Sequence, residues 1–259
     1  MFFAFKKKLS QNFLISSEYI KKFNDSVELL CDSKNKIIEI GPGRGAITDG
    51  LYNIFKKNLF LVEIDRDLYQ YLQSRYSYIY SNIFHKDFLK FEISQIVFDE
   101  FDKVNCVGNL PFGVSTPILF HLLDSKNFID KMCFILQKEV AMRLAAKPGN
   151  KAYGIPSIFF QAHYEVEYKY EIPPEAFFPR PKVTSSVVTI SKKKEQKNID
   201  YDESLFKKIV KESFSKRRKK IENSLKSLVG PEVIFNYKEM RPEELSVEDF
   251  ISITKLMKL

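Results

Sequence analysis

The residues best suited to chemistry are four that follow an apolar segment near the middle of the chain, Asn109-Leu110-Pro111-Phe112. The Asn109 side chain offers an amide oxygen, and the Leu110 carbonyl offers a second acceptor at a turn that Pro111 stiffens. Phe112 adds an aromatic face on which a planar base can stack. Two acceptors beside a ring suit methylation of an adenine amino group, because they can turn the nitrogen lone pair towards a methyl donor. Such chemistry needs positioning more than a strong base, so this turn is the candidate catalytic site.

A glycine-rich turn earlier in the chain is the candidate cofactor site. Glu39-Ile40-Gly41-Pro42-Gly43-Arg44-Gly45-Ala46 follows the first strongly apolar segment and precedes a helical pattern. Gly41 and Gly43 let a ligand approach the backbone closely. The spacing also satisfies a dinucleotide fingerprint with Ala46 in third place, and it lacks the Gly-Lys-Ser/Thr of a P-loop. Alone, this turn leaves both NAD and S-adenosylmethionine open as cofactors.

Acidic residues at the ends of the next two apolar segments extend the candidate cofactor site. Glu63 stands 22 residues after Gly41, where a carboxylate can accept hydrogen bonds from both ribose hydroxyls. Asp65 is better placed to cap the following helix. Asp87 can accept from an adenine amino group, with Phe88 packed against the ring. The alternatives are a solvated strand-end carboxylate for Glu63 and an ordinary loop acid for Asp87.

The elements that must position these residues alternate between short β-rich segments and helical patterns. This alternation predicts an α/β fold with a mainly parallel sheet. Strands are predicted over Lys36–Ile40, Leu59–Ile64, Lys103–Val107 and Met132–Gln137, with another leading to His85. Helices are predicted over Arg66–Tyr76, Pro117–Leu123 and Lys138–Ala146. Two edge strands are predicted over Tyr164–Tyr170 and Ser185–Ile190, separated by a proline-rich loop from Ile172 to Lys182.

A polar connector from Ser191 to Asn198 separates two predicted domains. Residues 1–190 form the predicted catalytic domain, whose residues 1–16 are an N-terminal arm. Residues 199–259 form a predicted all-helical domain. Its apolar side chains recur near helical spacing, at Phe206, Val210, Phe214, Ile221, Leu225 and Leu228.

The composition points to a basic protein with one sizeable core and a polyanionic partner. The 259 residues are 44% hydrophobic, and the net charge is +8 with a pI near 9.1. Three scattered cysteines fit a reducing compartment, and neither they nor the three histidines show metal-ligand spacing, so no metal is expected. No apolar run approaches the ~20 residues that span a bilayer. We therefore expect a cytoplasmic protein without membrane contact, and we also expect a monomer.

A run of five cations, Lys216-Arg217-Arg218-Lys219-Lys220, is the candidate RNA-binding segment. Five consecutive side chains cannot share one helical face, so we expect them to surround a helix end or turn that grips phosphates. A solvated charge run is the alternative. Charge reversal at Arg217 and Arg218 is predicted to weaken RNA binding. Further candidate cations, expected on the catalytic domain, are Lys6, Lys7, Lys8, Arg143, Lys147 and Lys151.

Motifs along nearly the whole chain carry a resemblance to a known family. They are Ser10-Gln11-Asn12-Phe13-Leu14, Glu39–Ala46, Glu63–Leu68, Asn109–Phe112 with Ser115-Thr116-Pro117, Leu136–Val140, Lys151–Gly154 and Phe178–Val183 with Ser185. With them the chain resembles the ribosomal RNA adenine N6-dimethyltransferases. Within that family it is most similar to the small-subunit enzymes, which dimethylate two adjacent adenines near the RNA 3′ end.

The resemblance implies a Rossmann-like class I methyltransferase domain, a seven-stranded sheet and a C-terminal helical domain that helps grip RNA. It implies S-adenosylmethionine as cofactor and small-subunit ribosomal RNA, within an assembling 30S-type subunit, as partner. It places Asn12, Leu14, Gly41, Glu63, Asp87 and Asn109 at the cofactor, joined by Gln11. It also places Phe177 or Phe178 beside the target base, opposite Phe112, against an alternative of core packing.

One departure and three rival functions accompany this resemblance. Small-subunit enzymes often carry Tyr where this chain has Phe112, so the ring face remains and a hydroxyl contact is lost.

The first rival function is that of a large-subunit methyltransferase that confers macrolide resistance. The second is a non-catalytic nucleic-acid binder on the same scaffold. The third, an NAD-dependent oxidoreductase, leaves the Asn109–Phe112 turn and the basic helical domain without a role and ranks last.

Overall fold

The computed structural model describes residues 11–97, 99, 102–194 and 201–257, which divide into two compact units. The first unit comprises Met1–Ala141 and Glu167–Lys192, and the second comprises Met142–Val166 and Lys193–Leu259. Residues 142–166 belong with the second unit partly through Phe159, whose ring centroid lies 6.1 Å from that of Phe206. The sequence predicts domains at 1–190 and 199–259. Whether these two ranges fold as independent domains stays a prediction.

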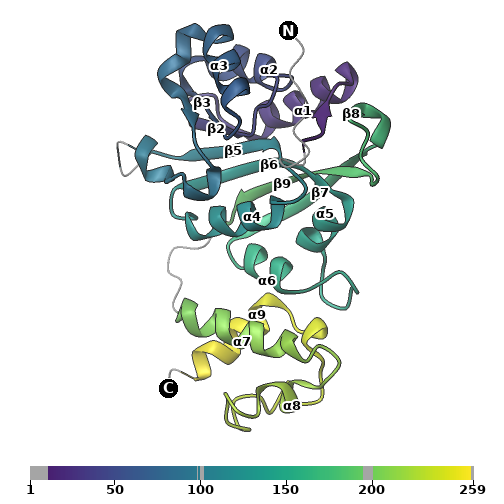
Figure 1. The fold of residues 1–259 in the computed structure, drawn as a ribbon. Coiled ribbons are helices and arrows are strands. Elements are labelled where there is room, and N and C mark those ends of the chain that lie inside the picture. The colour runs from purple at the N-terminus through teal and green to yellow at the C-terminus, as the bar shows by residue number, and fades with distance from the viewer. Residues whose placement is uncertain (1–10, 98, 100–101, 195–200, 258–259) are drawn as a thin grey trace. The chain divides into compact units, whose positions relative to one another are not determined.

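A seven-stranded sheet in the order β4-β3-β2-β5-β6-β9-β7 forms the centre of the fold (Figure 1). β2 pairs in parallel with β3 and β5, β3 with β4, and β5 with β6, whereas β9 is antiparallel to β6. The mainly parallel, seven-stranded Rossmann-like sheet is thus confirmed. The strands are β2 Lys36–Ile40, β3 Leu59–Glu63, β4 Ile83–His85, β5 Val104–Asn109, β6 Ile129–Gln137, β7 Tyr164–Ile172 and β9 Ser185–Lys192.

Helices of the first unit cover both faces of this sheet. α1, α2 and α3 lie on one face and α4 lies on the other (Figure 1). Continuous apolar strands such as β3, buried at every position, require this double cover. The helices are α1 Ser17–Leu30, α2 Thr48–Phe55, α3 Arg66–Arg75 and α4 Ser115–Asp124, and α5 Lys138–Ala145 spans the junction of the units. Short 3-10 turns are η2 Lys56–Asn58, η3 Ser77–Asn82, η4 Phe88–Lys90, η5 Ile93–Ile96 and η6 Pro174–Ala176.

A second, two-stranded sheet joins the N-terminal arm to the proline-rich loop. β1, Phe13–Leu14, pairs antiparallel with β8, Phe177–Phe178. The Ile15 N–H donates to the Ala176 carbonyl at 2.8 Å. Leu14 and Phe177 are both buried in the hydrophobic core cluster of this unit. Their burial fixes the arm beside the sheet, an arrangement that the sequence did not predict.

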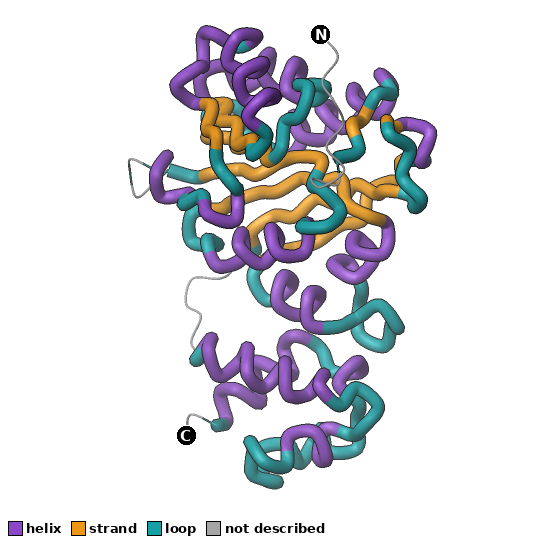
Figure 2. The backbone as a smooth tube through the Cα atoms, in the orientation of Figure 1, coloured by secondary structure: helices purple, strands orange, loops and turns teal. Residues whose placement is uncertain are grey.

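Within residues 201–257 the second unit consists of helices, turns and loops, and Figure 2 shows no strand there. Its elements are α6 Ile155–Gln161, α7 Glu203–Ser215, α8 Ile221–Leu225, η7 Pro242–Glu244 and α9 Val247–Leu256. Ser246 begins α9 with a capping box, since its hydroxyl accepts from the Asp249 N–H at 3.1 Å and donates to the Asp249 carboxylate. No helix among the described residues of either unit is both long and apolar enough to cross a membrane.

Candidate active site

A cavity of the first unit opens where the carboxyl ends of parallel strands meet. Five segments line most of it: 11–14, 39–44, 62–64, 86–89 and 109–114. Open α/β sheets bind ligands at this edge. Every residue predicted at the cofactor, from Gln11 to Asn109, lines this cavity, as do Leu110, Pro111 and Phe112.

Glu63 is held rigidly at the end of β3 by the glycine turn. Its Oε2 atom accepts from the Gly43 N–H at 3.0 Å, and its Oε1 atom accepts from the Asp65 N–H at 2.9 Å. Burial raises the pKa of Glu63, and these two hydrogen bonds act against that rise. Gly43 adopts a φ of 59°, which favours glycine. The turn therefore orients a buried carboxylate whose remaining lone pairs can accept from a ligand.

Two further acids behave differently from Glu63. Asp65 accepts from the Asp67 N–H at 2.9 Å and caps α3, which bears out the role predicted for it. Glu39, on β2, is wholly buried, and the Thr48 hydroxyl donates to it at 2.7 Å. Burial raises the pKa of Glu39 to about 8. A neutral Glu39 beneath the glycine turn avoids placing a second charge beside Glu63.

Asp87 and Phe88 form the wall of the cavity after β4. The Asp87 Oδ1 atom accepts from the Leu89 N–H at 3.0 Å, which caps the short helix η4 and fixes the carboxylate. Phe88 is buried, and its ring meets His121 edge-on with centroids 5.6 Å apart. The wall therefore combines a fixed carboxylate with a buried aromatic ring.

Asn109 is the last residue of β5, two residues beyond the predicted strand end. Its Nδ2 atom donates to the Asn12 carbonyl at 2.7 Å. A carbonyl can only accept, so this contact fixes which way the amide faces and leaves Oδ1 as the acceptor. Gly108 precedes it because a Cβ there would lie 2.5 Å from the Ile40 carbonyl oxygen of β2. The close approach of β5 to β2 thus sets Asn109 beside the glycine turn.

Comparison with known proteins decides what kind of site this is. The family model described as ribosomal RNA adenine dimethylase matches residues 2–259. The chain belongs to this family. It is therefore a methyltransferase of ribosomal RNA adenines, and both the predicted family and the predicted enzyme class are confirmed.

Relatives of similar length support this assignment. "Ribosomal RNA small subunit methyltransferase A" of Bacteroides fragilis is 39% identical over 96% of this chain and 90% of its own length. The protein of that name from Coxiella burnetii is 37% identical over 97% of each chain. Among solved structures, a Plasmodium falciparum dimethyladenosine transferase has a TM-score of 0.76 at 22% identity, with 93% of this chain and 95% of that chain covered. The 23S rRNA methyltransferase ErmE has a TM-score of 0.69 at 20% identity, covering 94% and 99%. These two structures show the shared fold.

The aromatic residues near the adenine dimethylase cavity separate into exposed and buried rings. Phe112 lines the cavity and is half-buried. Phe178 is 59% exposed and pairs with Phe13 across the small sheet, whereas Phe177 is only 2% exposed within the core cluster. Phe178 therefore remains the residue predicted to contact a target base. Phe177 instead packs in the core, which was the alternative considered for it.

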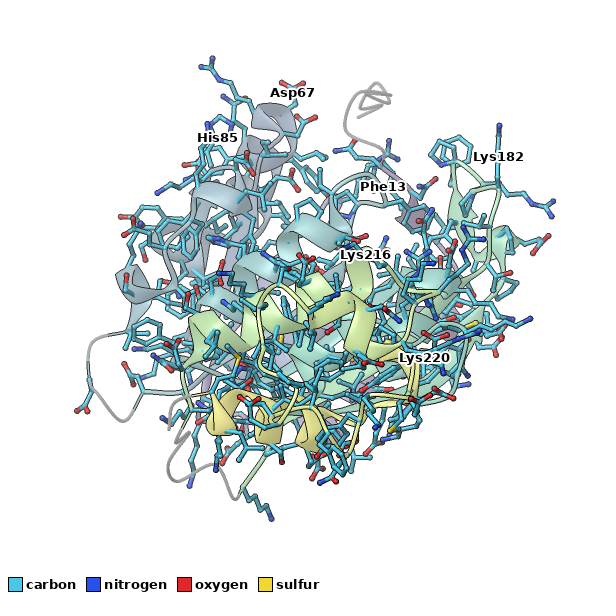
Figure 3. The ribbon with its side chains drawn as sticks, turned by 90° about the horizontal axis from the view of Figure 1, so that it is seen from below. Phe13, Asp67, His85, Lys182, Lys216 and Lys220 are labelled. Atoms are coloured by element: carbon cyan, nitrogen blue, oxygen red, sulfur yellow. The ribbon has the colours of Figure 1, made fainter. Side chains whose placement is uncertain are left out.

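Phe13 and Arg44 are among the cavity residues of this adenine dimethylase that sequence reasoning missed. A Cβ on Gly43 would lie 2.9 Å from the Phe13 ring, so the arm closes directly onto the glycine turn. The Arg44 guanidinium lies 5.0 Å from the Phe13 ring centroid, and Figure 3 marks Phe13. Arg44 lies in the middle of the glycine motif. A cation at that position could have indicated from the sequence that Arg44 lines the cavity.

The five-cation run lies in the second unit and joins α7 to α8, so the predicted turn is confirmed (Figure 3 marks Lys216 and Lys220). Arg217 donates to the Lys151 carbonyl at 2.6 Å and lies 3.8 Å from Glu243. Lys220 pairs with Glu239. Arg218 and Lys219 are exposed. Arg217 thus supports the turn itself, and Arg218 is the better probe of a phosphate contact.

Three of the other predicted cations lie on the surface of the second unit. Arg143, Lys147 and Lys151 are exposed and belong to the second unit, and Lys6, Lys7 and Lys8 lie outside the described residues. Within the described ranges, no group of three or more His, Cys, Asp or Glu is placed to hold a metal ion. Cys31, Cys106 and Cys133 are buried and unpaired.

Proposed function

We propose that this adenine dimethylase dimethylates N6 of two adjacent adenines near the 3′ end of small-subunit ribosomal RNA, with S-adenosylmethionine as the donor. The substrate is an assembling 30S-type subunit, and the protein acts in the cytoplasm as a monomer. The observation that carries the proposal is the Asn109 amide, which the Asn12 carbonyl orients at the edge of the cavity. The names of the two relatives support small-subunit RNA as the substrate.

The cavity residues fit S-adenosylmethionine in shape and chemistry. A Cβ on Gly41 would meet nothing within 4 Å, so the turn leaves open space for a ligand at a position whose φ is 65°. Glu63 offers a fixed carboxylate for two ribose hydroxyls, and Asp87 offers one for an adenine amino group. Phe88 supplies an apolar surface on the same wall.

The chain's own residues position the target amine. Asn109 Oδ1 and the Leu110 carbonyl accept from its two N–H groups and turn the nitrogen lone pair out of the ring plane. Phe112 stacks on the base, and Phe178 is the candidate for its other side. When bound, S-adenosylmethionine supplies a methyl group on a positively charged sulfur, which is a good leaving group. The Asn-Leu-Pro-Phe turn holds no titratable side chain, so the proton released by the amine passes to water.

Methylation of separated ribosomal subunits tests the proposal. Small and large subunits that lack adenine methylation are each incubated with the protein and methyl-labelled S-adenosylmethionine, and the modified nucleotides are located by mass spectrometry. We expect label on two adjacent adenines near the small-subunit 3′ end and none on the large subunit. Label on the large subunit would favour a macrolide-resistance enzyme, and no label on either would favour a non-catalytic relative.

A further inference from the structure

Phe235 is a phenylalanine of the second unit whose ring is open to solvent. Its exposed fraction is 66%, and Phe178 is the only other exposed phenylalanine in the described part of the chain. A single exposed apolar side chain needs no explanation by itself. The rigidity and the charge of its surroundings therefore decide whether Phe235 is a binding residue.

The backbone on either side of Phe235 is anchored. Ile234 is buried in the second unit, and its carbonyl accepts from the Tyr237 N–H at 2.8 Å. The Tyr237 carbonyl in turn accepts from the Met240 N–H at 2.9 Å. A ring presented by an anchored turn loses little conformational freedom when a ligand covers it.

A cation lies over this ring. The Lys238 Nζ atom lies 4.8 Å from the Phe235 ring centroid, over one face of the ring. The Lys238 carbonyl accepts from the Glu222 N–H at 3.3 Å, and the Met240 carbonyl accepts from the Ile221 N–H at 2.8 Å. These bonds lay the segment along the start of α8, next to the five-cation run, where Lys220 also pairs with Glu239. An exposed ring beside a cation, on a segment that adjoins the five-cation run, has the chemistry of a stacking platform for nucleic acid.

We propose that Phe235 and Lys238 form a nucleobase-binding site in which an unpaired RNA base stacks on the ring face opposite Lys238. Lys238 and the exposed cations Arg218 and Lys219 contact the flanking phosphates. This inference rests on the proposed function in that the partner is RNA. A protein partner is disfavoured because an apolar contact would have to bury these charges.

Binding of two RNA probes by the full chain tests the site. One probe is a hairpin with an unpaired loop that carries 2-aminopurine, and the other is a fully paired duplex of equal length. The variants are Phe235→Ala, the ring-keeping Phe235→Tyr, and Tyr78→Ala, which removes a 90% exposed ring from the first unit. Phe235→Ala is expected to weaken hairpin binding on the order of tenfold. It should leave duplex binding and the circular dichroism melting curve unchanged.

Stacking gives a second readout that charge alone would not move. Wild-type protein and Phe235→Tyr should quench the 2-aminopurine fluorescence, Phe235→Ala should not, and Tyr78→Ala should behave as wild type. Equal hairpin affinity in wild type and Phe235→Ala, or equal losses on hairpin and duplex, would overturn the site. The methylation assay tests the proposed function, and the binding and fluorescence assays test the Phe235 site. Either one can therefore fail without the other.

Discussion

At the residue scale, the proposed chemistry depends on a contact between two asparagines. The Asn109 side chain donates to the main-chain carbonyl of Asn12, so its orientation depends on the position of the arm rather than on the Asn12 side chain. Leu14, buried in the core, holds that arm in place. Substrate positioning in this enzyme is therefore coupled to the packing of its N-terminal arm.

Gly43→Ala should impair cofactor binding more than stability alone explains. The substitution places a Cβ at a φ of 59° and 2.9 Å from the Phe13 ring, so the arm or the turn must shift. We expect an unfolding free energy lower by roughly 1–2 kcal/mol and an affinity for S-adenosylmethionine at least about tenfold weaker, a loss of ~1.4 kcal/mol. Calorimetric titration and urea unfolding measure the two effects.

Gly149→Ala is the matched control for this prediction. Gly149 also has a left-handed φ, 82°, but a Cβ there meets nothing within 4 Å and the residue lies outside the cavity. This variant should lose similar stability and keep wild-type cofactor affinity. The same affinity loss in both variants would show that the contact between Phe13 and the turn is irrelevant to binding.

Some site residues could be predicted from their own type and position in the sequence, and others could not. Glu63 and Asp87 end apolar strands, and the helix cap at Asp65 follows from its type and position, so local sequence is enough for all three. The contact between Asn12 and Asn109 joins residues 97 positions apart through a backbone carbonyl, which no residue type reveals. Phe177 and Phe178 are identical in type, and only strand alternation on β8 decides which of them is buried.

At the element scale, β2 carries a buried acid that links stability to pH. The pKa of Glu39 is about 8 in the folded chain, against 4.5 for an ordinary glutamate. Between those values the folded state holds one more proton than the unfolded state. The stabilising effect of that proton is complete below pH 4.5 and is lost as the pH rises through 8.

Glu39→Gln should flatten the pH dependence of unfolding. The wild-type free energy of unfolding should fall relative to the variant by up to about 1.4 kcal/mol per pH unit across this window. The glutamine keeps an acceptor for the Thr48 hydroxyl and removes the titration. Urea unfolding followed by circular dichroism at pH 5.5, 6.5 and 7.5 measures the difference. Parallel curves for the two proteins would contradict a neutral, buried Glu39.

The main sheet was predictable from sequence and the small one was not. Apolar runs such as β2 and β3 identify themselves by composition, and their alternation with helices indicates parallel pairing. β1 and β8 have two residues each, which is too short for any periodicity. Their pairing is decided by the burial of Leu14 and Phe177 in a core built from many elements.

At the scale of the whole molecule, the candidate active site and the five-cation run belong to different compact units. The cavity belongs to the first unit, and the five-cation run belongs to the second. The turn at that run could be predicted, because five consecutive cations cannot lie on one helix face. The inclusion of residues 142–166 in the second unit could not, because it depends on side-chain packing such as that of Phe159 against Phe206.

Arg218→Gln should weaken RNA binding without affecting the cofactor. One lost phosphate contact lowers the slope of log affinity against log salt concentration by about one. Lys21→Gln is the control, because Lys21 is exposed on α1 and already pairs with Asp25. Fluorescence anisotropy with small-subunit RNA at several salt concentrations gives the slopes. An unchanged slope for Arg218→Gln would mean that this cation is merely solvated.

The most direct test of the whole account measures methyl transfer by Asn109→Ala to small subunits that lack the modification. We expect the rate of adenine methylation near the RNA 3′ end, read by mass spectrometry, to fall by on the order of 100-fold. The thermal unfolding midpoint should stay close to that of wild type, because the Asn109 side chain donates its hydrogen bond to the arm. Wild-type rates from Asn109→Ala would contradict the claim that the turn after β5 holds the adenine amine.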